Sequence, residues 1–155
     1  LESADLIVGY NLLRFDYRVL SAYEQRDYER LPTFDMLVAL KAVLQQRLAL
    51  ANLGQATLGR GKSADGLQSL RWVQEGRLDL VERYCRDDVA LTRDLFEHAL
   101  REDHLAFESG GRILRTPPLG WDLQRLVQEA ARRRAARVRG GQTSLFAAPP
   151  PRPPY

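Results

Sequence analysis

The chain holds a single cysteine, Cys85, among its 155 residues. One thiol cannot build a disulfide framework or a cysteine-rich zinc site, and this scarcity is typical of a reducing compartment. The sequence also lacks any apolar run near the roughly 20 residues that span a bilayer, and its first residues show no signal-peptide pattern. We therefore expect a cytoplasmic protein with no membrane partner. An apolar content of 45% is enough for one hydrophobic core.

The net positive charge of the chain comes from the residues after 110. Residues 1–110 hold 14 Lys and Arg against 18 Asp and Glu, whereas residues 111–155 hold 9 against 2. A basic amphipathic helix is predicted over Leu119–Val138, and Arg132–Arg134 lie within it. Such a charged face is most often only solvated. Binding to the backbone of a nucleic acid is the alternative.

Periodicity and chain breakers predict an α/β protein that is rich in helix. We expect a domain over residues 1–108, a short extended piece plus the basic helix over 109–139, and a disordered proline-rich tail over 140–155. The expected elements are a strand at 6–8, a helix at 12–25 capped by Asn11, a strand or helix start at 33–37, a helix at 36–50, a loop with a short helix at 52–66, a short helix at 69–75, a long helix at 78–103 and an extended piece at 112–116.

An aspartate lies on the predicted apolar face of each of two helices. At 100° per residue, Asp88 falls inside the apolar stripe of the long helix, whereas Asp87 points about 100° away from it. The stripe comprises Val81, Cys85, Thr92, Leu95, Phe96 and Ala99. Tyr84 lies one turn before Asp88 on the same edge.

The second such aspartate is Asp16, in the helix predicted after Asn11. It falls among Leu12, Val19, Leu20 and Tyr23, which we expect to form the core face of that helix. A buried acid costs several kcal/mol unless it is paired or binds a metal. A capping or ion-paired role is open for either acid alone, but two together indicate a shared cation.

Two blocks of sequence resemble known nuclease motifs. GYNLLRFD at Gly9–Asp16 is similar to the second motif, and YCRDDVALTRDLF at Tyr84–Phe96 to the third motif, of the DEDD 3′–5′ exonucleases. The Tyr-x-x-x-Asp spacing of Tyr84 and Asp88 resembles that of the tyrosine-containing DEDDy subclass. The segment LGQATLGRGKSADG between the blocks resembles one in a bacterial group of predicted exonucleases. This resemblance covers about residues 5–108 and implies a partial ribonuclease H-like fold.

The resemblance implies an enzyme that hydrolyses phosphodiester bonds at the 3′ end of DNA or RNA with Mg²⁺ or Mn²⁺ in a two-metal site. Asp16 would be an outer-sphere or water-mediated metal ligand and Asp88 a direct one. Tyr84 would orient the attacking water or help to deprotonate it. Asn11 and Phe15 would shape the substrate pocket, Phe15 by packing or by stacking near a terminal base.

The family's first motif, an Asp-x-Glu pair on the opening strand, has no counterpart before Gly9. The resemblance therefore implies that half of the metal ligands are missing from this sequence. We expect a fragment of a longer exonuclease, with weak or no two-metal binding on its own. The alternative is a non-catalytic module that binds nucleic acid or a sliding clamp.

Two further segments are candidates for binding. Gly59–Ser63 suggests a phosphate-binding loop, but Ala56 stands where the first glycine of that motif is required, so Lys62 is retained only as a candidate contact to a nucleic-acid phosphate. In the tail, Gln142, Leu145 and Phe146 resemble the short peptide by which bacterial replication and repair proteins dock on the sliding clamp. A chance match is equally compatible with so short a pattern.

Overall fold

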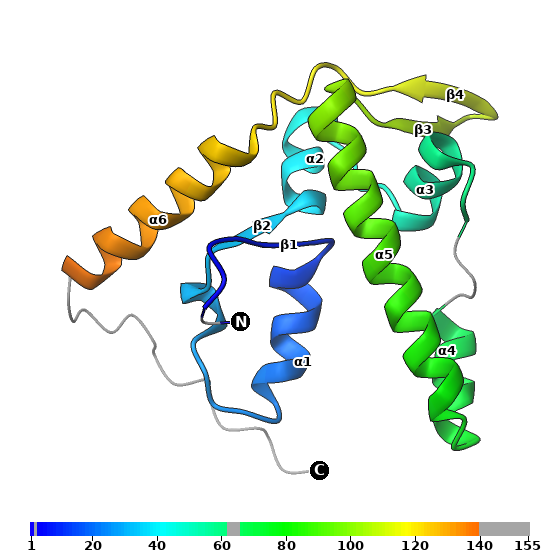
Figure 1. Ribbon diagram of the computed structural model, residues 1–155. Coiled ribbons are helices and arrows are strands. Elements are labelled where there is room, and N and C mark those ends of the chain that lie inside the picture. The colour runs from blue at the N-terminus through cyan, green and yellow to red at the C-terminus, as the bar shows by residue number, and fades with distance from the viewer. Residues whose placement is uncertain (2, 62–65, 140–155) are drawn as a thin grey trace, which may run out of the picture.

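The computed structural model describes residue 1 and residues 3–61 and 66–139 (Figure 1). It confirms a mixed α/β chain that is mostly helical. Its elements are, in order, β1 (Ile7–Gly9), the π-helical turn η1 (Leu12–Asp16), α1 (Tyr17–Ser21), the 3₁₀ turn η2 (Tyr28–Arg30), β2 (Thr33–Asp35), α2 (Met36–Leu44), α3 (Leu50–Leu58), α4 (Gly66–Gln74), α5 (Leu78–Glu102), β3 (Ala106–Ser109), β4 (Arg112–Arg115) and α6 (Leu123–Arg139). Within the described residues, no helix is both long and apolar enough to cross a membrane.

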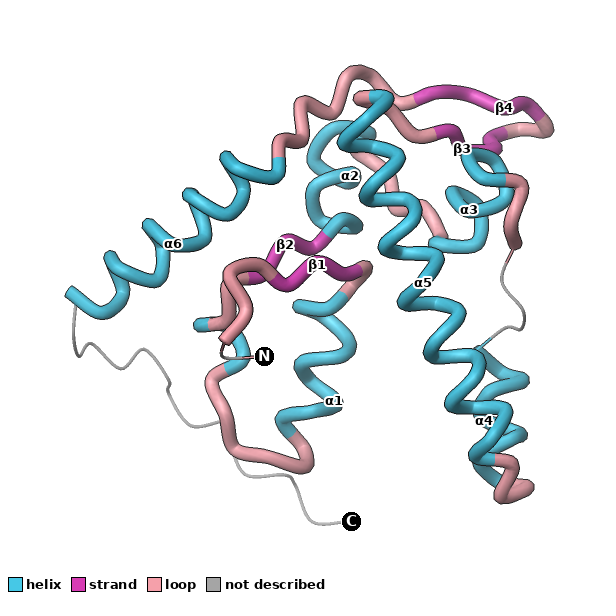
Figure 2. Tube along the Cα trace, viewed as in Figure 1, coloured by secondary structure: helices cyan, strands magenta, loops and turns pink. Residues whose placement is uncertain are grey.

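The first sheet consists of β1 and β2, which run parallel in the middle of the fold (Figure 2). Their register pairs Gly9 with Asp35, so both strands end at the same level. The turn η1 follows β1, and α2 follows β2 directly. The carboxyl ends of parallel strands are where α/β proteins commonly place their functional groups.

The hydrophobic core lies between α2, α3 and the C-terminal half of α5. Its buried members are Met36, Leu40, Leu48, Leu50, Leu53, Leu91, Leu95, Phe96, Ala99, Leu105 and Phe107. Trp121, from the segment before α6, packs edge-on against Phe34 at 5.0 Å between ring centroids and lies 6.0 Å from Phe96. Aromatic pairs at such distances add to the stabilisation from burial alone.

The short helix expected within the loop over 52–66 is α3, which begins earlier than expected, at Leu50, and ends at Leu58. Two side chains of α3 explain its position. Thr57 Oγ1 exchanges hydrogen bonds of 2.9 Å with the backbone N–H and C=O of Ala106, and the Asn52 amide does the same with Glu108. Both contacts hold β3, which pairs with β4 in an antiparallel hairpin. This hairpin spans the domain boundary expected between residues 108 and 109.

The long helix predicted over 12–25 is instead a π-helical turn followed by the short α1. The predicted core face is wrong, since Val19, Leu20 and Tyr23 are 45%, 39% and 87% exposed. The buried residue is Tyr17, whose ring stacks on Tyr28 with centroids 5.4 Å apart. A π turn changes the angular spacing of the side chains, so a wheel drawn at 100° per residue selects the wrong face.

The helix predicted over 78–103 is confirmed as α5, but its apolar stripe is buried only from Leu91 onward. Cys85, which the wheel placed in the stripe, is exposed. The N-terminal half of α5 packs against α4, where Trp72 contacts Tyr84 edge-on at 6.4 Å between ring centroids. The basic helix predicted near the C-terminus is confirmed as α6, on the side of the fold away from α4 (Figure 1).

Candidate functional site

Asp35 organises the chain around the carboxyl ends of β1 and β2. It is 5% exposed, and its two carboxylate oxygens accept hydrogen bonds from four backbone N–H groups. Oδ1 accepts from Asn11 at 2.9 Å and from the first turn of α2, and Oδ2 accepts from Leu13 at 3.1 Å. Asp35 therefore caps α2 and at the same time fixes the start of η1.

Asn11 occupies the position before η1 in the left-handed region, at φ 68° and ψ 24°. Its side chain makes no capping hydrogen bond, so the prediction that Asn11 caps the following helix is wrong. Asn and Asp adopt this region more readily than other non-glycine residues, because their short polar side chains lower its cost. Asn11 keeps this conformation because its backbone N–H then donates a hydrogen bond to Asp35 Oδ1.

Asp16 ends η1 and is half-buried. Burial raises the pKa of its carboxyl, a hydrogen bond from its own backbone N–H lowers it, and the charges of Asp35 and Asp88 raise it further. The carboxylates of Asp35 in β2 and Asp88 in α5 thus both lie within electrostatic reach of Asp16 in η1. Short π-helical segments such as η1 occur frequently at functional sites.

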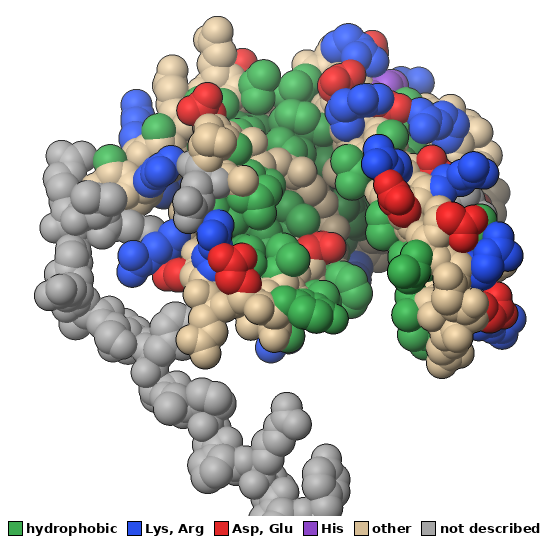
Figure 3. Space-filling model, turned by 60° about the horizontal axis from the view of Figure 1, so that its bottom comes forward, with side chains coloured by type: hydrophobic (Ala, Val, Ile, Leu, Met, Phe, Trp, Pro, Cys, Tyr) green, Lys and Arg blue, Asp and Glu red, His purple; other side chains and the backbone are tan. Residues whose placement is uncertain are grey.

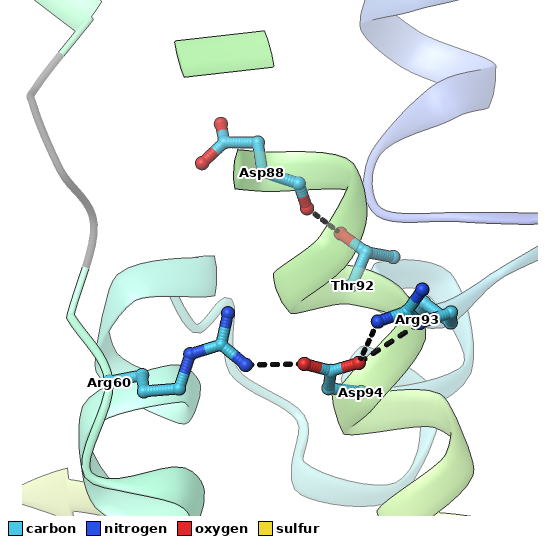
Figure 4. A network of polar contacts seen from close by, with 5 residues as sticks. All are labelled: Arg60, Asp88, Thr92, Arg93 and Asp94. Atoms are coloured by element: carbon cyan, nitrogen blue, oxygen red, sulfur yellow. Dashed lines mark hydrogen bonds and ion pairs between the residues drawn. The ribbon is translucent and has the colours of Figure 1, made fainter. Parts of the chain in front are cut away.

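Asp88 lies on the N-terminal half of α5 and is half-buried, whereas its neighbour Asp87 is exposed. The wheel's choice of Asp88 as the inward-facing acid is therefore consistent with the structure. Its backbone carbonyl accepts a hydrogen bond of 2.8 Å from Thr92 Oγ1. Its carboxylate projects from α5 apart from the Arg60–Asp94–Arg93 contacts below it (Figure 4).

The Arg60–Asp94 ion pair fixes the end of α3 to α5 close to Asp88 (Figure 4). Arg93 also donates to Asp94 through Nε at 3.0 Å and Nη2 at 2.8 Å. Hydrogen bonds from Arg93 and Arg60 lower the pKa of Asp94. Asp94 is thus already neutralised by two arginines and is distinct from the group formed by Asp16 and Asp88.

A hollow separates the N-terminal elements from the N-terminal half of α5 (Figure 3). These are the two parts of the chain that carry Asp16 and Asp88, respectively. Tyr84 lies one turn before Asp88 and is half-buried against Trp72. Phe15, beside Asp16 in η1, is 61% exposed. Asp16 and Asp88 lie within electrostatic reach of one another, and an exposed aromatic ring lies in the same turn as Asp16.

The carboxylate oxygens of Asp16 and Asp88 suit a hard divalent cation, but they supply only part of its coordination. Within the described residues, no group of three or more His, Cys, Asp or Glu side chains gathers in a metal-holding arrangement. Mg²⁺, however, is commonly held by one or two carboxylates, with water and substrate phosphates completing its coordination. Asp16 and Asp88 fit that role for one ion, and a second ion would need ligands from outside this pair.

The remaining predicted residues are spread over the molecule. Arg132–Arg134 are exposed on α6. Lys62 lies outside the described residues, as do the candidate clamp-docking residues Gln142, Leu145 and Phe146.

Two features escaped the sequence analysis. Asp35 directly precedes an apolar helix, which is a recognisable capping signal, but its bonds to Asn11 and Leu13 depend on the tertiary fold. The rings of His98 and His104 meet edge-on at 5.8 Å, although their spacing of six does not place them on one helix face. The chain reverses at Asp103, where φ is 58°, and this turn brings them together.

Comparison with protein-family models, with curated proteins and with solved structures found no significant match to this chain.

Proposed function

We propose that this chain carries part of the active site of a metal-dependent 3′–5′ exonuclease with a ribonuclease H-like fold. The observation that carries the proposal is that Asp16 in η1 and Asp88 in α5, two half-buried acids from distant parts of the sequence, lie within electrostatic reach of one another. A divalent cation held between two such carboxylates would offset their mutual repulsion. The resemblance of both segments to exonuclease motifs supplies the reaction class.

In this proposal Asp16 and Asp88 hold one Mg²⁺ or Mn²⁺ ion. When bound, the ion supplies Lewis-acid activation of the scissile phosphate. Tyr84 positions the attacking water through its phenol, and its contact with Trp72 restrains the ring. The water oxygen bonds to phosphorus while the bond to the 3′ oxygen breaks, and that oxygen takes a proton. The products are a nucleoside 5′-monophosphate and a shortened strand.

The substrate contacts follow from exposure and charge. In this proposal Phe15 stacks on the terminal base, and its exposure in the turn that carries Asp16 supports this role. Arg132–Arg134 on α6 offer exposed cations to the phosphate backbone without sequence preference.

The test is release of labelled nucleotide from the 3′ end of single-stranded DNA and RNA in the presence of Mn²⁺ or Mg²⁺. We expect slow metal-dependent release, because this chain supplies ligands for one ion only, and we expect that release to be lost in Asp88→Asn and in Asp16→Asn. Asp87→Asn is the matched control, since it removes an equal charge from an exposed position next to Asp88.

A parallel measurement follows Mn²⁺ binding by electron paramagnetic resonance, with the same three variants. Metal binding that is unchanged in both Asp16→Asn and Asp88→Asn, or hydrolysis that survives Asp88→Asn, would overturn the proposal. Binding of nucleic acid with neither metal binding nor hydrolysis would favour a non-catalytic binding module instead.

A further inference from the structure

A cavity of about 340 Å³ lies between η1 and α2. Its lining residues are Asn11, Arg14, Leu37, Val38, Lys41, Ala42, Gln45 and Arg47. The lining contains three cationic side chains and no Asp or Glu. It is therefore a basic cavity within a part of the chain that is acidic overall, since residues 1–110 hold more Asp and Glu than Lys and Arg.

The sequence of α2 explains why one wall of the cavity is polar. Val38, Lys41, Ala42 and Gln45 follow one another at helical spacing and form a single exposed face, while Leu40 packs into the core. The helix ends at Leu44, and the following residue, Gln45, adopts the left-handed region at φ 55°. The side-chain amide of Gln45 donates to the carbonyl of Ala42 at 2.8 Å. This hydrogen bond fixes the position of the Gln45 side chain at the end of the cavity wall.

Arg47 reaches the cavity from the turn between α2 and α3. The next residue, Leu48, is buried, and its carbonyl accepts a hydrogen bond of 2.7 Å from the Tyr10 phenol. Burial raises the pKa of Tyr10, the charge of Arg47 lowers it, and that of Asp35 raises it. Arg47 and Asp35 are therefore both close to Tyr10, and the anchored turn holds Arg47 near the carboxyl ends of the strands.

The three cations of the cavity lack carboxylate partners among the described residues. No ion pair found there involves Arg14, Lys41 or Arg47. The nearby Asp35 directs both of its oxygens to backbone N–H groups. The lining itself carries three positive charges and no carboxylate, which favours an anionic ligand.

A second cavity, of about 380 Å³, has a different character. It lies between β2 and α6 and is lined by Arg133 and Arg134 but also by Glu129. Arg30, also in its lining, is paired with Asp27 at 2.8 Å. Its positive charge is partly neutralised by the protein itself, so an anion has less to gain there.

We propose that the cavity between η1 and α2 binds a phosphate group of a single-stranded nucleic acid through Arg14, Lys41 and Arg47. Arginine guanidinium groups bind phosphate oxygens through two parallel hydrogen bonds, and lysine adds a compact charge. Arg14 and Asp16 are two residues apart in η1, so their side chains face different directions. One short turn thus presents a phosphate contact on one side and a candidate metal ligand on the other. This proposal rests on the proposed function, because it supplies the strand that is to be cut.

The test measures binding of a fluorescent single-stranded oligonucleotide in EDTA, so that no metal-dependent step contributes. We expect the triple variant R14Q/K41Q/R47Q to bind about tenfold more weakly or worse at low salt, since charge-assisted hydrogen bonds are lost. The plot of log affinity against log salt should become shallower by about 0.7 for each phosphate contact removed. Wild-type affinity and slope in the triple variant would overturn the proposal.

The matched control is R101Q/R112Q/R115Q, which removes the same number of exposed positive charges from the end of α5 and from β4. Affinity and slope should stay close to those of the wild type. An equal loss in the control would show a general effect of net charge and would also refute the site. Urea unfolding of both variants checks that each remains folded.

Two further arms separate the outcomes. Asp88→Asn should abolish metal-dependent hydrolysis yet bind the oligonucleotide in EDTA as the wild type does, so that failure of hydrolysis and failure of the phosphate site are distinguishable. Inorganic phosphate, followed by ³¹P NMR, tests the other source of the same ligand. If phosphate binds the wild type and not the triple variant while the oligonucleotide does not bind, a free phosphate site is retained and the nucleic-acid ligand is overturned.

Discussion

Replacement of Asp35 should destabilise the protein through the four backbone N–H groups that its carboxylate accepts. In Asp35→Ala the loss of the cap on α2 costs about 1 kcal/mol. The N–H groups of Asn11 and Leu13 also lose their acceptor, at about 1 kcal/mol each, the low end of the range for buried donors, because both bonds are only partly buried. The expected loss is about 3 kcal/mol.

Asp35→Asn separates the contribution of Oδ1, which accepts from Asn11 and α2, from that of Oδ2, which accepts from Leu13. Its single carbonyl oxygen still serves Asn11 and the first turn of α2, but its NH₂ group then faces the N–H of Leu13, and two donors cannot pair. We expect a cost of about 1 to 2 kcal/mol, smaller than that of Asp35→Ala, because only the N–H of Leu13 loses its acceptor. Removing the charge at residue 35 should also lower the pKa of Asp16, which that charge raises.

Urea unfolding followed by circular dichroism measures both free energies, and NMR titration of the Asp16 carboxyl measures the pKa. Asp87→Asn is the control for loss of one negative charge at an exposed site, and its stability should stay within about 0.5 kcal/mol of the wild type. If Asp35→Ala is as mild as this control, the idea that Asp35 holds η1 against α2 is wrong.

Two further predictions concern packing and pH. Gly54→Ala should destabilise the fold by about 1 to 3 kcal/mol, because the new methyl would lie 2.6 Å from the backbone oxygen of Arg60 and 2.9 Å from the methyl groups of Leu91. In Gly61→Ala the new methyl meets only the end of a flexible side chain, so an equal loss in both variants of a urea unfolding series would contradict this account. Because the pKa of Asp16 is raised in the folded state, the folded chain binds more protons than the unfolded one between the two pKa values, and stability should fall as pH rises through that window. Asp16→Asn should remove this fall and be at least as stable as the wild type at neutral pH without metal, and a less stable variant in thermal unfolding at pH 7 would refute the reasoning.

The regular parts of the fold followed from the sequence, and the irregular ones did not. The helix α5 keeps its α-helical spacing throughout, so a wheel distinguished the half-buried Asp88 from the exposed Asp87. In η1 that spacing fails, and apolar residues such as Val19 are left exposed while Tyr17 is buried. Hydrophobic pattern predicts burial only where the helix type is known.

Hydrogen bonds between residues that are distant in the sequence could not be predicted either. The position of Asp35 before α2 is visible in the sequence, yet its contacts with Asn11 and Leu13 depend on the parallel pairing of β1 and β2. The hydrogen bonds of Asn52 and Thr57 to β3 likewise cross about fifty residues. Local preference contains no information on such contacts, and this is why the β3–β4 hairpin was predicted only as one extended piece.

The same side chains of α3 determine how the hairpin can meet other strands. On the side of β3 away from β4, the backbone groups of Ala106 and Glu108 are already bonded to Thr57 and Asn52. A further strand therefore finds no free donor or acceptor at these two residues. Growth of the hairpin into a larger sheet, whether by a partner protein or by self-association, is directed to the opposite edge along β4, whose Arg112 and Arg115 would repel a second copy of the chain and favour an acidic strand.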